Sequence, residues 1–202
     1  MRELVGPNFP IAIDANQVWD VDVAITWINA LKEYKLRWVE EPTSPNDVLG
    51  HAKIAAAVAP TPIATGEMAS SRIIFKQLLQ AKGFSVMQID ATRVAGVNEN
   101  LANILMAAKF GIPVCPHAGG VGLCEMVQHL AMWDAVAVTG HHPARVVEFV
   151  DHLHQHFLDP VQISGGNYIA PQRAGAGAEM HQSSIDEYSF PNGTYWKNEA
   201  HS

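Results

Sequence analysis

Acidic and imidazole side chains recur at regular intervals from residue 14 to residue 117. Each ends a short run of apolar, mostly β-branched residues, and together they are Asp14, Glu40, Glu67, Asp90 and His117. The intervals between them are 26, 27, 23 and 27 residues, which is typical of a repeating strand–helix unit. In a (β/α)₈ barrel the catalytic groups sit at the carboxyl ends of different strands. The spacing therefore predicts that these five side chains meet at one site.

Four of these side chains are carboxylates, and the first three, Asp14, Glu40 and Glu67, end adjacent predicted strands. At neighbouring strand ends they would concentrate negative charge in a small volume, and a bound cation is the natural way to offset it. Magnesium prefers oxygen ligands, whereas zinc favours thiolates, and the set contains none. The sequence therefore predicts a Mg²⁺ site at these residues. A single acid would more often be a solvated strand end or a helix cap, and only the joint pattern favours a metal.

The adjacent acids Glu40 and Glu41 must point to opposite faces of a strand, so only one of them can be the inward ligand. We predict that Glu40 is the ligand and that Glu41 makes a supporting salt bridge. His117 and Asp90 end consecutive predicted strands. A carboxylate bonded to one ring nitrogen selects the tautomer and raises the imidazole pKa. These two residues are therefore predicted to form a general acid–base dyad.

The elements that would position these residues alternate along the chain. Strands are expected at 11–14, 36–40, 62–67, 85–90, 113–117 and 135–138, with 145–149 as a competing or additional strand. Helices are expected at about 20–34, 46–58, 70–82, 98–110 and 122–133, with Asp20, Asn46, Ser70 and Asn98 as N-caps. Such alternation predicts an α/β fold with a parallel sheet.

The number of strand–helix units is about six, fewer than a closed (β/α)₈ barrel contains. We therefore expect an incomplete barrel over residues 1–160. From about Leu158 the pattern gives way to Gly, Ala, Pro and polar residues. The tail over 161–202 is expected to pack on another structure and not to form a core of its own.

Composition narrows the class of protein. The net charge of the 202 residues is −7 at pH 7, which argues against a nucleic-acid partner, because phosphate backbones require a basic surface. The sequence has no apolar run of about 18 residues and no secretory leader pattern. We therefore expect no membrane contact and a cytoplasmic location. The two cysteines, Cys115 and Cys124, are expected to be reduced thiols that fill the core.

Five short motifs carry a family resemblance. They are Asp14-Ala-Asn-Gln, Trp38-Val-Glu-Glu-Pro, Ala64-Thr-Gly-Glu, Gln88-Ile-Asp and the run from Pro116 to Glu125. In this order and at these intervals they resemble the mandelate racemase-like branch of the enolase superfamily. The last run, together with 148–156, is similar in particular to L-fuconate dehydratases. The resemblance covers almost the whole chain and implies strands 3 to 8 of the barrel, with the capping domain of the family absent.

The reaction that this resemblance implies is a Mg²⁺-dependent dehydration. A six-carbon sugar acid resembling L-fuconate would lose its α-proton and its β-hydroxyl, passing through an enediolate to a 2-keto-3-deoxy sugar acid. By the resemblance, Asp14, Glu40 and Glu67 hold the ion. A related aldonate dehydratase or an epimerase is the alternative within the family.

The resemblance also implies roles for four further positions. His117, tuned by Asp90, would be the acid that assists departure of the hydroxide. Glu148 would donate a hydrogen bond, as a neutral acid, to the substrate carboxylate. Asn16 would contact the same carboxylate.

One family motif is not matched. The second lysine of a Lys-x-Lys motif, the base for the α-proton, belongs at the end of the second strand, ahead of the first strand found here. Lys32, Lys35 and Lys53 are predicted to face away from the site. A non-catalytic fragment that keeps the metal site and self-associates is therefore a second hypothesis. In either case we expect a homo-oligomer formed through exposed sheet edges.

The remaining histidines resemble a metal-binding tract but have no converging carboxylate in the sequence. They include His141, His142, His152, His154 and His156. We predict surface or interhelical roles for them.

Overall fold

The computed structural model describes residues 1–140 and 145–199, and its centre is a sheet of four short parallel strands. Their order is β1-β2-β3-β4, and their bounds are Ile13–Asp14, Val39–Glu40, Ile63–Thr65 and Val86–Met87. A single parallel bridge from Met87 to Val114 continues the sheet into the next segment. The predicted α/β fold with a parallel sheet is confirmed.

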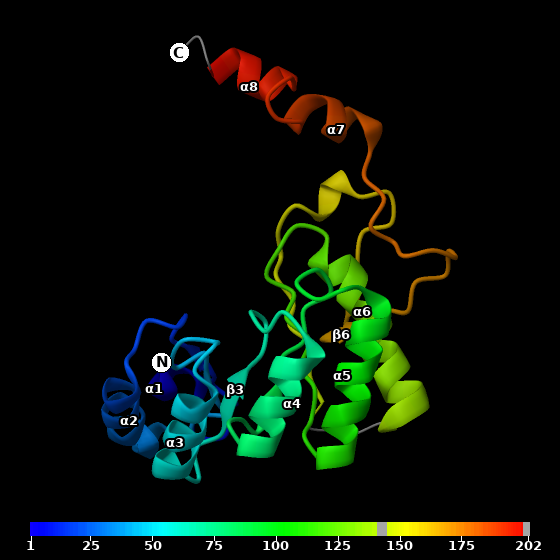
Figure 1. Ribbon diagram of the computed structural model, residues 1–202. Coiled ribbons are helices and arrows are strands. Elements are labelled where there is room, and N and C mark those ends of the chain that lie inside the picture. The colour runs from blue at the N-terminus through cyan, green and yellow to red at the C-terminus, as the bar shows by residue number, and fades with distance from the viewer. Residues whose placement is uncertain (141–144, 200–202) are drawn as a thin grey trace.

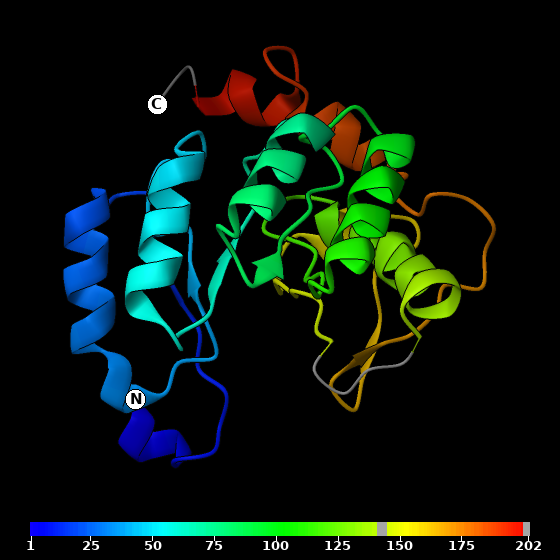
Figure 2. The same ribbon diagram turned by 60° about the horizontal axis from the view of Figure 1, so that its bottom comes forward.

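Helices follow the strands as the periodicity predicts and pack side by side along the sheet (Figures 1 and 2). They are α2 (Val21–Ala30), α3 (Val48–Val58), α4 (Arg72–Ala81), α5 (Val97–Phe110) and α6 (Leu123–Trp133). Shorter elements are α1 (Arg2–Val5) and the 3₁₀ turns η1 (Lys32–Tyr34) and η3 (His154–His156). The core lies between these helices and the sheet, where Ile54, Ile63, Phe75 and Met87 are fully buried.

The strand predicted at 135–138 is wrong. Asp134–Val138 forms the π-helical turn η2, which continues α6. Polar contacts anchor this turn, because the buried Asp134 carboxylate accepts a hydrogen bond from Thr139 Oγ1 at 2.9 Å and pairs with Arg145 at 3.0 Å. The competing strand at 145–149 is not formed as a strand either, although its Glu148 N–H donates a hydrogen bond to Pro116 O at 3.3 Å.

Helix caps were predicted less well than the helices. Asp20 precedes α2 as expected, but Asp47, Ser71 and Gly96 precede α3, α4 and α5. The predictions of Asn46, Ser70 and Asn98 as N-caps are therefore wrong. At α3 the reason is geometric, since the Asp47 carboxylate reaches Gly50 N at 2.7 Å.

The tail contains a hairpin, β5 (Ile163–Ser164) with β6 (Asn167–Tyr168), and the helices α7 (Gln182–Tyr188) and α8 (Thr194–Glu199). The hairpin side of the tail contacts the body, because Val161 and Tyr168 pack against a buried cluster that contains Cys124. Figure 1 shows α7 and α8 lying beyond the body at the end of the chain. The packing of this tail on another structure stays a prediction.

The two cysteines lie in the core. Cys115 and Cys124 are free, buried thiols, as predicted, and burial raises the pKa of Cys115 to about 12. Over the residues that the structure describes, none of the helices has the length and apolar character required to span a membrane. His141 and His142 lie outside the described residues.

Candidate active site

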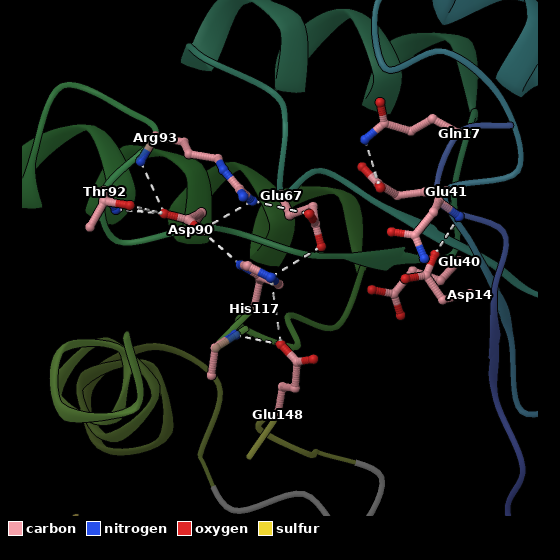
Figure 3. A network of polar contacts seen from close by, with 12 residues as sticks. Asp14, Gln17, Glu40, Glu41, Glu67, Asp90, Thr92, Arg93, His117 and Glu148 are labelled. Carbon is pink, nitrogen blue, oxygen red and sulfur yellow. Dashed lines mark hydrogen bonds and ion pairs between the residues drawn. The ribbon is translucent and has the colours of Figure 1, made fainter. Parts of the chain in front are cut away.

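The predicted site residues lie at the carboxyl ends of the parallel strands, as the strand register requires. Asp14 stands opposite Glu40 in the β1–β2 pair. Beyond the assigned strands the pairing continues through single backbone hydrogen bonds, such as Gln88 N to Thr65 O at 3.0 Å and His117 N to Ile89 O at 2.9 Å. Figure 3 shows the resulting edge, which carries all the predicted acids and the imidazole of His117.

The two residues of the predicted dyad are in contact. His117 Nδ1 lies 2.7 Å from Asp90 Oδ2, and both side chains are almost completely buried. The second carboxylate oxygen of Asp90 accepts hydrogen bonds from the Thr92 N–H at 2.6 Å, the Thr92 hydroxyl at 2.7 Å and the Arg93 N–H at 3.0 Å. Asp90 is therefore held in place from both of its oxygens.

These contacts shift both members of the dyad toward their charged forms. Burial alone would raise the pKa of Asp90, but the hydrogen bonds from His117, Thr92 and Arg93 outweigh it and lower that pKa to about 2. At His117, burial lowers the pKa of the imidazole. The hydrogen bond to Asp90 and the negative charges of Glu67 and Glu148 outweigh burial and leave that pKa raised. The dyad therefore favours an imidazolium beside a carboxylate.

The second ring nitrogen of His117 faces two further acids. Its Nε2 lies 3.3 Å from Glu67 Oε2 and 4.0 Å from Glu148 Oε2. Glu148 also accepts a hydrogen bond from the Ala118 N–H. A side chain at Gly119 would not fit here, since its Cβ would lie 2.7 Å from Nε2. With Nδ1 held by Asp90, Nε2 is the nitrogen that can exchange a proton with a ligand.

Arg93 is a site residue that the sequence reasoning missed. Its Nη1 lies 3.0 Å from Glu67 Oε1 and 3.4 Å from Asp90 Oδ2, so it links two of the predicted acids. The available signal was weak: an Asp at a strand end followed two positions later by Thr is typical of a turn stabilised by the Asp side chain. Such a turn would place the next side chain beside the site.

Glu40 and Glu41 point apart, as predicted, but the expected salt bridge of Glu41 is wrong. Trp38 Nε1 donates to Glu40 Oε2 at 3.0 Å, whereas Glu41 accepts a hydrogen bond at 2.7 Å from the side-chain amide of Gln17. Burial is the main cause that raises the pKa of both acids, that of Glu41 to about 7. An amide suffices as the partner because a buried acid with this pKa carries less charge.

The three carboxylates predicted to hold a cation face the same edge but are not drawn together. Asp14 is close enough to raise the pKa of both Glu40 and Glu67. Across the described residues, however, no three His, Cys, Asp or Glu side chains are grouped closely enough for a metal. Glu67 is turned toward His117 and Arg93, while Asp14 and Glu40 lie together on the other side (Figure 3). The donor chemistry, three carboxylates without a thiol, fits a hard cation such as Mg²⁺.

Asn16 and Glu148, the predicted contacts of a substrate carboxylate, also lie at this edge. The backbone N–H of Asn16 donates to Asp14 Oδ1 at 2.8 Å, and its side chain is exposed. Its φ of 47° is in the left-handed region, which Asn tolerates better than most residues.

A family model described as enolase C-terminal domain-like matches residues 1–184 of the chain. The human protein named mitochondrial enolase superfamily member 1 is 51% identical over 199 residues, which are 98% of this chain and 45% of that protein. L-galactonate dehydratase of Hypocrea jecorina is 50% identical over 201 residues, covering 96% of this chain and 44% of the enzyme. The chain therefore spans about half the length of these relatives.

Solved structures agree with the sequence relatives. The crystal structure of the human protein superposes with a TM-score of 0.97 at 50% identity, covering 100% of this chain and 46% of that one. L-talarate dehydratase from Polaromonas sp. JS666, crystallised with Mg and L-glucarate, gives a TM-score of 0.76 at 30% identity over 90% of this chain and 48% of that one.

Proposed function

The chain belongs to the family of enolase C-terminal domain-like proteins, and from this premise we propose that it is the catalytic part of a magnesium-dependent sugar-acid dehydratase. The observation that carries the proposal is the His117–Asp90 dyad beside three strand-end carboxylates. The proposed substrate is a six-carbon sugar acid resembling L-fuconate. A relative that is 50% identical is named L-galactonate dehydratase, and L-fuconate differs from L-galactonate only in lacking the terminal hydroxyl.

Asp14, Glu40 and Glu67 are the residues that would hold Mg²⁺. When bound, the ion supplies positive charge that stabilises the negative charge developing on the substrate carboxylate as the α-proton leaves. The support from this chain is its donor set, which consists of carboxylate oxygens. Burial is the main cause that raises the pKa of Glu40 and Glu67, and the negative charge of Asp14 acts in the same direction on both. Structural relatives crystallised with magnesium support the same choice of ion.

His117 is the proposed acid. Asp90 holds the proton on Nδ1, so the proton that moves is the one on Nε2. Transfer of that proton to the β-hydroxyl lets the hydroxyl leave as water while the C–O bond breaks. Glu148 and Asn16 are proposed to orient the substrate carboxylate. Ala118 N–H binds Glu148 Oε2, which leaves Oε1 as the oxygen that can carry a proton toward the substrate.

Lys32, Lys35 and Lys53 cannot be the base that removes the α-proton, because none of them lies at the site. Lys53 pairs with Asp22 at 2.7 Å on the exposed side of the helices. Lys32 and Lys35 lie at or next to η1, before β2, and so at the opposite end of that strand from Glu40. We therefore propose that full turnover needs the preceding Lys-x-Lys segment of the family. A non-catalytic, metal-holding role for this polypeptide alone is the second candidate function that these positions favour.

A keto-acid assay tests the proposal. This chain and a longer polypeptide that includes the preceding segment would be incubated with Mg²⁺ and L-fuconate, L-galactonate or, as a non-sugar comparison, mandelate. We expect the longer polypeptide to release a 2-keto-3-deoxy acid from the sugar acids only. His117→Asn should abolish the product, and His156→Asn, a histidine outside the site, should not.

Two results would contradict the proposal. One is epimerisation or racemisation of the substrate without any keto acid, which would make the chain part of an epimerase or racemase and not of a dehydratase. The other is full turnover by His117→Asn, which would remove the acid from the mechanism. Product formation by the 202-residue chain itself would instead eliminate the non-catalytic alternative.

A further inference from the structure

A second buried carboxylate–imidazole pair lies outside the dyad. Glu125 on α6 is fully buried, and its Oε1 lies 2.7 Å from Nδ1 of His154 on η3. The other ring nitrogen of His154, Nε2, lies 2.9 Å from the carbonyl oxygen of Val150. Both ring nitrogens thus face oxygen acceptors. An imidazole can satisfy two acceptors only when both nitrogens carry a proton.

The surroundings of the pair favour that extra proton. Glu125 Oε1 also accepts the Val161 N–H at 3.3 Å, while Oε2 is buried without a hydrogen-bond partner among the described residues. A buried carboxylate in this condition is costly unless a positive charge lies beside it. Asp151, in the same segment as His154, adds a second negative charge. The phenol of Tyr168 stays neutral, since burial and Cys124 raise its pKa.

A chain of contacts links the pair to the active site. The His154 ring stacks on Phe149, with centroids 5.6 Å apart and planes at 7°. Tyr168 lies nearly perpendicular to Phe149, with ring centroids 6.0 Å apart and planes at 82°, and its hydroxyl donates a hydrogen bond to the backbone carbonyl of Glu148. The backbone that follows the Glu148 Cα is therefore held at two carbonyls, those of Glu148 and Val150. The Glu148 side chain accepts the Ala118 N–H next to His117.

We propose that the protonated His154–Glu125 pair, together with Tyr168, positions the Glu148 carboxylate in the active site. His154 and Glu125 act through Phe149 and the Val150 carbonyl, so they are positioning residues and touch no substrate. When the ring loses its second proton it can donate to only one of its two acceptors, and the segment that carries Glu148 loses one anchor. What Glu148 does to a substrate rests on the proposed function, whereas its positioning does not.

The raised pKa of His154 decides how the positioning of Glu148 should depend on pH. Burial lowers the pKa of this ring, but the hydrogen bonds to Glu125 and the Val150 carbonyl leave it raised. A group whose folded-state pKa is raised contributes fully below the unfolded value, about 6.5 for histidine. The two hydrogen bonds of His154, to Glu125 and to the Val150 carbonyl, should therefore both be present in mild acid. One of them should be lost as the pH rises through the folded-state pKa of His154.

Amide hydrogen exchange at Ala118 measures this positioning directly, because that N–H donates to the Glu148 carboxylate. Exchange would be followed by NMR from pH 5 to 9 (a range of about four units around the histidine pKa) and corrected for the intrinsic rate. We expect protection of Ala118 to fall as His154 loses its proton. His154→Gln should lower it roughly tenfold at the acidic end, as loss of a hydrogen bond to a charged group predicts.

Two controls separate positioning from general loosening. The amide of His117 bonds to Ile89 O at 2.9 Å, and its protection should stay unchanged in His154→Gln. His156→Gln removes a neighbouring histidine that bonds to Ser184 and should leave Ala118 unchanged. Tyr168→Phe, which deletes only the hydroxyl, should lower Ala118 protection in the same way.

Equal protection of Ala118 in the parent and in His154→Gln would overturn the proposal, as would a parallel loss at both the Ala118 and His117 amides. If His154→Gln does not fold, the pH profile of the parent protein and the Tyr168→Phe variant decide the matter. The measurement needs no turnover. Failure of the dehydration proposal would therefore leave its outcome unaffected.

Discussion

Asp90 is the site residue whose charge depends most on its neighbours. Four hydrogen bonds from three residues hold it ionised, and they lower its pKa to about 2 against the opposing effect of burial. A group with a depressed folded-state pKa stabilises the fold above its unfolded value, near 3.8, and loses that contribution as the pH falls toward 2.

Asp90→Asn should therefore lower the free energy of unfolding by about 2 kcal/mol at pH 7. The difference between parent and variant should shrink between pH 4 and the folded-state pKa of about 2. Urea titrations across that range measure it. A difference that stays constant with pH would mean that the ionised form of Asp90 is not the stabilising one.

For the site residues, the sequence predicted which side chains come together but not the rotamers that they adopt. Asp90 and His117 were found because a strand register brings consecutive strand ends together. Glu67 has the same register, yet its rotamer follows Arg93 and His117, which are distant in sequence. The amide partner of Glu41, Gln17, was missed for the same reason.

Helices and strands were predicted correctly where the periodic apolar residues form a buried face in the structure. The helix at 122–133 was placed correctly, but 135–138 also alternates in a way that fits a strand, and only the anchors of Asp134 show that the helical path continues. Caps were predicted less well. At α3 and α4 the cap lies one residue after the polar residue that was predicted, and at α5 it is a glycine, Gly96.

The cap of α3 provides a test at the scale of elements. Asp47 Oδ1 accepts the Gly50 N–H at 2.7 Å, whereas Asn46, one position earlier, lies outside the capping position. Asp47→Ala should destabilise the protein by about 1 kcal/mol. Asn46→Ala should change stability by much less. Thermal or urea unfolding of both variants measures this, and equal losses would mean that the cap hydrogen bond is not the cause.

In the molecule as a whole, β1 is the open edge of the four-stranded sheet in the part of the chain that the structure describes. Exposed apolar side chains lie near it in sequence, with Leu4, Phe9 and Val18 at 89%, 57% and 74% exposure. Unpaired edge groups and exposed apolar surface both favour association, the latter by about 25 cal/mol per Å² buried. We therefore predict a dimer or larger oligomer.

Sedimentation velocity at micromolar concentration measures that prediction. We expect the main species to have at least twice the 22.0 kDa mass of the chain. Its dissociation should be promoted by Val18→Lys, which places a charge four residues after β1, and not by Leu49→Lys, a similarly exposed position on α3. A single compact species of 22.0 kDa would contradict the prediction.

Mg²⁺ titration by calorimetry shows whether Asp14, Glu40 and Glu67 form one divalent cation site. We predict one ion per chain and binding that is weakened at least tenfold, or about 1.4 kcal/mol, by each of Asp14→Asn, Glu40→Gln and Glu67→Gln. Asp22→Asn, which changes an exposed acid on α2, is the matched control and should bind as the parent does. Undiminished binding by all three site variants would mean that these carboxylates do not hold the ion.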